Sequence, residues 1–126
     1  MTLQLKFEHL EARYALARLA RGSALPTWAH EEFGAAIVSA EGITVVCRES
    51  AVPDGVDARI GFHCVTIVGA FEIESVGVVA AAVRPLAAAG ISVFVYSTLQ
   101  TDYLLFQETD LERAVQALLK AGHTFS

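Results

Sequence analysis

The sequence predicts an α+β fold of the ferredoxin-like type, with two helices packed on one face of a sheet. Residues 62–68 are rich in β-branched side chains, which is typical of a strand. Residues 68–106 then read as a loop, a helix and two strands joined by a tight turn, and residues 109–121 read as a second helix. The order β-α-β-β-α is that of the split βαβ module, and residues 123–126 can add a short last strand.

Helical periodicity supports the first expected helix. Gly90 follows the apolar pattern and predicts the end of this helix, because glycine adopts the left-handed conformation that stops a helix. Pro85 lies inside the pattern and predicts a kink or an irregular last turn. The apolar positions at helical spacing are Val76, Val79, Ala80, Val83, Leu86 and Ala87.

The second expected helix carries stronger boundary signals. Thr109 and Glu112 have the spacing of a capping box, and Gly122 predicts the end of the helix. Two helices with one apolar face each need a sheet to cover. The apolar stripe of this helix consists of Leu111, Val115, Leu118 and Leu119.

The N-terminal half predicts a second, degenerate copy of the same module. Residues 3–7 alternate as a half-buried strand does, and residues 14–19 read as another strand. Two apolar runs flank Glu41 and Gly42, which is a hairpin signal. The segment 49–57 is the expected boundary, so we expect tandem modules at residues 1–58 and 59–126.

Composition excludes several classes of protein. The 126 residues are 54% hydrophobic, with a mean hydropathy of +0.48 and a net charge of −5. These values exclude disorder and provide an ample core, and the scattered basic residues argue against nucleic acid as a partner. No apolar run is long enough to span a membrane, and no signal peptide is visible, so we expect a cytoplasmic setting.

Catalytic and metal-binding patterns are weak. The four histidines have no ligand spacing, Cys47 and Cys64 lie in apolar strand-like runs, and we expect no metal and no cofactor. The loop 69–77 contains two glutamates and lacks the glycine-lysine pattern of a phosphate loop. The remaining interpretation of these residues is a ligand-binding site. The start of the first helix would bind a carboxylate, and Asp102 would either counter an ammonium group or only stabilise its turn.

The run from Gly90 to Tyr103 resembles the ACT domain family, in particular the small tandem ACT proteins related to the CASTOR amino-acid sensors. The resemblance covers about half of the chain. The loop before the first helix differs from those relatives at Glu74 and Val76. The matching residues are Gly90, Ile91, Ser92, Phe94, Ser97, Thr98, Thr101, Asp102 and Tyr103.

The resemblance implies a binding site for a small amino acid and a non-enzymatic regulatory or sensor function. The output would be a change of conformation or assembly presented to a protein partner. Separately, the high hydrophobicity and the open edges of a small sheet predict side-by-side pairing of modules, within the chain or as a homodimer. Two alternatives stay open: a partner-docking ACT protein with a decayed pocket, and a small enzyme on the ferredoxin-like scaffold. The implied ligand-binding residues are Gly69, Ala70, Ile73, Ser75, Val76, Thr98, Leu99 and Asp102.

Overall fold

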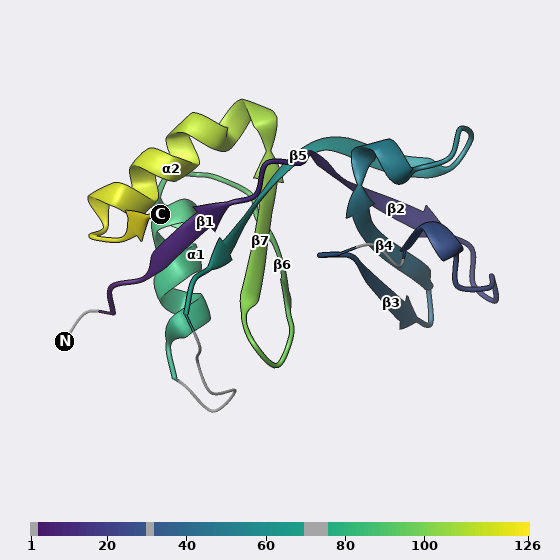
Figure 1. Cartoon of the computed structure of the whole chain (residues 1–126), viewed down its shortest axis with the longest axis horizontal. Helices are drawn as coiled ribbons and strands as arrows, with labels where there is room; N and C mark the ends of the chain where they lie inside the picture. The colour runs from purple at the N-terminus through teal and green to yellow at the C-terminus, as the bar shows by residue number, and fades with distance from the viewer. Residues whose placement is uncertain (1–2, 30–31, 70–75) are drawn as a thin grey trace. The chain divides into compact units, whose positions relative to one another are not determined.

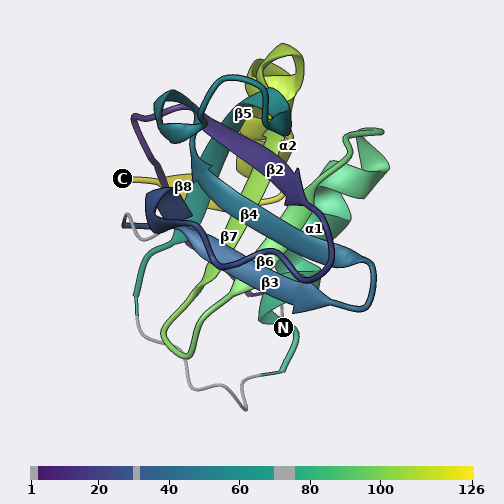
Figure 2. The same cartoon turned by 90° about the vertical axis from the view of Figure 1, so that its right-hand side faces the viewer.

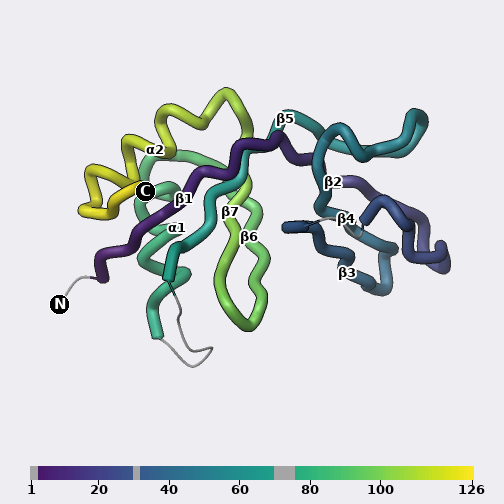
Figure 3. Tube along the Cα trace, in the orientation of Figure 1, coloured from purple at the N-terminus to yellow at the C-terminus, as the bar shows by residue number. Residues whose placement is uncertain are grey.

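The computed structural model describes residues 3–29, 32–69 and 76–126 (Figure 1). The chain forms two compact units, of which unit 1 comprises Met1–Glu11 and His63–Ser126, and unit 2 comprises Ala12–Phe62. Unit 2 is therefore inserted into unit 1 in sequence. Figure 3 shows the purple start of the chain running beside the teal strand β5 within unit 1.

Unit 1 has the α+β ferredoxin-like arrangement that the sequence predicts. Its sheet has the strand order β6-β7-β5-β1-β8, in which β1 is antiparallel to β5 and parallel to β8. The expected short last strand is present as β8. The described elements are β1 (Lys6–His9), the end of β5 (Asp57–Ile67), α1 (Val78–Ala88), β6 (Phe94–Ser97), β7 (Asp102–Gln107), the 3-10 turn η3 (Glu108–Asp110), α2 (Leu111–Lys120) and β8 (Thr124–Phe125).

Both helices of unit 1 pack on the same face of its sheet. Phe7 and Ile67 are cross-strand partners, so their side chains lie on one face. Both belong to one buried cluster, which also contains α1 and α2 side chains. The helix residues of this cluster are Val78, Ala82, Leu86, Ala114 and Leu118.

The buried face of α1 differs from the predicted stripe. The helix buries Val78, Ala82 and Leu86, whereas Val76 is 91% exposed and lies before the helix. The prediction was wrong because valine and alanine occur all around this helix, so hydrophobicity does not select one face. Gly90 ends α1 as predicted, with a φ of 74° and a bond from the Ile91 N–H to the Leu86 carbonyl.

The second helix also differs at its start. The predicted capping box is wrong, because Asp110 is the N-cap residue and makes no capping hydrogen bond with its side chain. The guanidinium of Arg113 instead donates to the Asp110 carboxylate over 2.9 Å. Gly122 ends the helix as predicted, and the His123 N–H donates to the Leu118 carbonyl.

His123 is buried and joins three segments of unit 1. Its Nδ1 accepts the Leu5 N–H over 3.0 Å, so the neutral ring carries its proton on Nε2. That Nε2 lies 2.9 Å from the carbonyl oxygen of Ala81 and donates to it. Pro85 has no N–H and cannot form the helical bond to the same carbonyl. The imidazole therefore replaces the bond that proline removes from α1.

Unit 2 is an antiparallel sheet in the order β3-β4-β2-β5 (Figure 2). The predicted hairpin is present, and Gly42 is required in it because a Cβ there would lie 2.5 Å from the Leu19 carbonyl oxygen. A core around Val45 packs against Trp28. The described elements are β2 (Tyr14–Leu19), η1 (Thr27–Ala29), β3 (Ala35–Ser39), β4 (Gly42–Arg48), η2 (Glu49–Ala51) and the start of β5.

The two units differ from the expected modules at residues 1–58 and 59–126. Strand β1 belongs to unit 1, and β5 begins at Asp57 rather than near residue 62, so one strand contributes to both units. The difference arises because β1 pairs with β5 and β8, which are distant in sequence. Local sequence patterns do not predict these pairings. Whether the units act as tandem modules stays a prediction.

We predict that His123→Ala destabilises unit 1. The change leaves the buried Leu5 N–H and the Ala81 carbonyl without a partner, at a cost of about 1–3 kcal/mol for each group. It also removes the edge-on contact with the Phe7 ring, whose centroid lies 5.6 Å away. Urea unfolding measures the loss. Gln116→Ala on the exposed side of α2 is the control and should change stability by less than about 0.5 kcal/mol.

Candidate ligand site

The turn between β6 and β7 is organised by Thr98. Its N–H donates to the Thr101 carbonyl over 2.9 Å, and its hydroxyl oxygen accepts the N–H groups of Gln100 and Thr101 at 3.1 and 3.2 Å. The hydroxyl of Thr98 is therefore used within the turn. Leu99, at the tip, is 70% exposed. This turn presents an apolar side chain on a hydrogen-bonded scaffold.

Asp102 is the first residue of β7 and lies opposite Ser97 in the hairpin. The Ser97 hydroxyl donates to Oδ1 of the Asp102 carboxylate. The hydroxyl of Thr66 on β5 donates to the backbone carbonyl of Asp102 over 3.2 Å. The Asp102 carboxylate thus bonds within its own hairpin, to a side-chain hydroxyl, and its role towards a ligand stays a prediction. The bond from Ser97 uses one oxygen of the carboxylate.

The turn is attached to the end of β5. The hydroxyl of Thr101 donates to the Ile67 carbonyl over 2.8 Å. Gly69 follows two residues later, is exposed and has a φ of 109°. This attachment brings Gly69 into the neighbourhood of the turn that holds Thr98, Leu99 and Asp102.

The start of α1 lies at the same end of unit 1 as this turn (Figures 1 and 2). Its N-cap residue is Gly77, which provides no side-chain cap, and the first internal bond runs from the Ala81 N–H to the Gly77 carbonyl. The N–H groups of Val78, Val79 and Ala80 therefore have no helical partner. The predicted site residues Ala70, Ile73 and Ser75 lie outside the described residues.

A groove of about 530 Å³ runs along the exposed side of α1 from its start. The predicted site residue Val76 lines it together with Leu3, and the guanidinium of Arg84 supplies positive charge. Thr98, Leu99 and Asp102 do not line this groove. The described residues of the predicted site thus lie in three places: Val76 at the groove, Gly69 after β5, and Thr98, Leu99 and Asp102 at the β6–β7 turn.

Burial raises the pKa of two groups on neighbouring strands, Cys64 of β5 and Tyr103 of β7. The pKa of the Cys64 thiol rises to about 12. Tyr103 stacks on Tyr96 across the hairpin, with ring centroids 4.8 Å apart. Although His63 directly precedes Cys64, neighbouring residues of a strand point to opposite faces, so the imidazole does not activate this thiol.

Two searches of the described part of the chain concern clusters of metal ligands and membrane-spanning helices. Residues 3–29, 32–69 and 76–126 contain no group of three or more His, Cys, Asp or Glu side chains arranged for a metal ion. No described helix has the length and apolar character needed to span a membrane. The cytoplasmic setting and the absence of nucleic acid stay predictions.

Sequence reasoning missed two histidine arrangements. His123 bonds across three segments, and His9 lies beside His63, although these residues are far apart in sequence. Spacing along one helix or strand cannot reveal either arrangement. The one local signal was Pro85, which leaves a carbonyl in need of a partner.

Comparison with protein families gives a match over the C-terminal half of the chain. The family described as "ACT domain" matches residues 57–120. This range includes the predicted turn, the loop and both helices. No curated protein matches the chain at a significant level.

Solved structures resemble the whole chain. A protein from Agrobacterium tumefaciens has 31% identity and a TM-score of 0.93, and the match covers 99% of this chain and 94% of that chain. A protein of unknown function from Vibrio cholerae, described as a possible transport protein, has 25% identity and a TM-score of 0.76, with 94% and 90% covered. The regulatory subunit of aspartate kinase from Thermus thermophilus, in its ligand-free form, has 13% identity, a TM-score of 0.61, and 89% and 95% covered. The last likeness shows the fold alone.

We predict that Cys64 makes stability fall at alkaline pH. In the unfolded chain its thiol ionises near the ordinary pKa of 9.0, whereas in the folded protein it ionises only near 12. The stability it contributes is present below pH 9 and is lost as the pH rises towards 12, because only the unfolded state then releases the proton. Urea unfolding between pH 8 and pH 11 measures the slope. Cys64→Ala should reduce it, and an unchanged slope would contradict the assignment.

Proposed function

The chain belongs to the ACT domain family, and we propose that it is a regulatory protein that binds a small amino acid and catalyses no reaction of its own. The observation that carries the proposal is the shared end of unit 1, where the β6–β7 turn and the start of α1, whose N-cap residue Gly77 has no side chain, both lie. The match of the ACT family to residues 57–120 supports a regulatory role.

An amino acid has two charged groups, and this end offers a complement to each. The N–H groups at the start of α1 that have no helical partner carry a partial positive charge, which suits a carboxylate. Asp102 keeps one carboxylate oxygen beyond the bond from Ser97, and this oxygen suits an ammonium group. We therefore retain Gly69, Val76, Thr98, Leu99 and Asp102 as the described part of the proposed site, with Ala70, Ile73 and Ser75 completing it.

Ligand binding would change the conformation or the assembly of the protein, and a partner protein would recognise that change. Strand β3 supports an assembly role, because it is the last strand in the sheet order of unit 2 and contains no charge and no proline. Its residues Ile37 and Val38 are 43% and 68% exposed. We propose that this edge pairs with a second copy of the chain. If the pocket is decayed, this docking function would remain alone.

We predict that Asp102→Asn keeps the fold and loses most of the ligand response. The amide oxygen can still accept the Ser97 hydroxyl, so the turn is retained, but the charge that pairs with the ammonium group is removed. A ligand at about 100 times its Kd stabilises the wild type by about 2.7 kcal/mol. Loss of the charge weakens binding by about 2–5 kcal/mol.

A thermal-shift screen of the twenty amino acids measures this effect, with Asp54→Asn on the exposed surface of unit 2 as the control. The control should respond like the wild type. A ligand shift of equal size in Asp102→Asn would show that Asp102 only stabilises the turn. No shift with any amino acid would favour the docking alternative.

We predict that Val38→Lys weakens self-association. A lysine on an edge strand opposes pairing with another strand, since its charge would lose water at the interface. Sedimentation at several protein concentrations measures the change. Leu25→Lys makes the same substitution at a residue that is 56% exposed in a loop, and it should leave association unaltered. A wild type that stays monomeric at high concentration would refute the pairing.

A further inference from the structure

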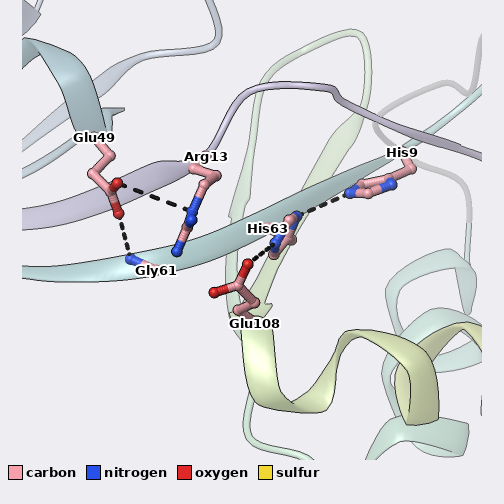
Figure 4. A network of polar contacts seen from close by, with 6 residues as sticks. All are labelled: His9, Arg13, Glu49, Gly61, His63 and Glu108. Atoms are coloured by element: carbon pink, nitrogen blue, oxygen red, sulfur yellow. Dashed lines mark hydrogen bonds and ion pairs between the residues drawn. The ribbon is translucent and has the colours of Figure 1, made fainter.

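Two histidines of unit 1 meet at a point that the proposed ligand site does not use. Nε2 of His9 lies 3.1 Å from Nδ1 of His63, and the ring centroids are 5.2 Å apart (Figure 4). His9 is exposed, whereas the side chain of His63 is only 11% exposed. The pair therefore consists of one exposed imidazole, that of His9, and one largely buried imidazole, that of His63.

The pairing of β1 with β5 creates this arrangement. His9 lies opposite Val65 in the antiparallel ladder, and His63 is the next residue of β5 on the same face. Diagonal neighbours on a sheet face are within reach of side chains as long as histidine. The position is fixed by backbone hydrogen bonds on both strands.

Glu108 orients the second histidine from its other side. Its Oε1 lies 3.5 Å from Nε2 of His63, and this nitrogen is buried and has no hydrogen-bond partner among the described residues. The carboxylate attracts the proton of the ring to Nε2. The lone pair of Nδ1 then points towards His9. A carboxylate behind a histidine is the outer partner that metal-binding histidines usually have.

We propose that His9 and His63 bind a divalent transition-metal ion such as Zn²⁺, with Glu108 as the positioning residue. Two imidazole nitrogens that each lie about 2.0–2.1 Å from one ion are separated by about the observed distance when they occupy adjacent coordination positions. When the ion binds, it replaces the hydrogen bond between these two nitrogens, and the neutral His9 ring then carries its proton on Nδ1.

The chemistry of the pair favours one class of ion. Imidazole suits zinc, copper and nickel, whereas magnesium and calcium prefer oxygen ligands. With two histidine ligands, the ion would keep positions for water or for a further ligand. It would also cross-link β1 to β5, the two strands by which the chain leaves unit 1 after Glu11 and returns at His63.

Titration of the full chain with ZnCl₂ by calorimetry tests the proposal. We expect one Zn²⁺ bound per wild-type chain and at least tenfold weaker binding in His9→Gln. Glu108→Gln should weaken binding by about 10–100-fold, as losses of outer partners do. Glu8→Gln, an exposed carboxylate on the same strand, is the matched control and should bind like the wild type.

The substitution is made at the exposed His9 because a change at the largely buried His63 would also disturb folding. The melting temperature of each variant without metal confirms that it is folded. Nuclear magnetic resonance of the imidazole nitrogens should show Zn²⁺ shifting both His9 and His63 in the wild type. Equal Zn²⁺ affinity of the wild type and His9→Gln would overturn the proposal. Failure of the wild type to bind at millimolar ZnCl₂ would do the same, and the pair would then be a hydrogen bond alone.

Discussion

The hydrogen bonds of the His123 imidazole connect α1, the N-terminal segment and the C-terminal segment of unit 1. Pro85 would otherwise leave the Ala81 carbonyl without its helical partner, so the proline and the histidine are complementary. The same imidazole binds the Leu5 N–H, and the Thr124 N–H donates to the Leu5 carbonyl. Both backbone groups of one buried residue thus depend on the C-terminal segment.

The bond to the Ala81 carbonyl also bears on the candidate site. Ala81 lies one turn from Gly77, so His123 anchors α1 close to the N–H groups that are proposed to bind a carboxylate. Thr101 anchors the facing turn to β5 in a comparable way. Binding groups that are held by such contacts lose little freedom when a ligand arrives, which favours affinity.

The order of elements in unit 1 and both helix-ending glycines could be predicted, because these depend on local signals such as those at Gly90 and Gly122. The buried face of α1 could not, since alanine and valine surround that helix. The capping box failed because Asp110, rather than Thr109, begins α2. The paired histidines depend on strands distant in sequence, and Asp102 proved to be bonded to Ser97, which spacing alone did not decide.

The N–H of Leu10 donates to the Cys64 carbonyl over 3.0 Å, so the chain leaves unit 1 and re-enters it at adjacent backbone positions. A segment whose ends are already paired can be removed and replaced by a tight hairpin turn without displacing either strand. Unit 1 is therefore a host into which residues 12–62 could have been inserted, and from which they could be excised, while its ladder stays in register.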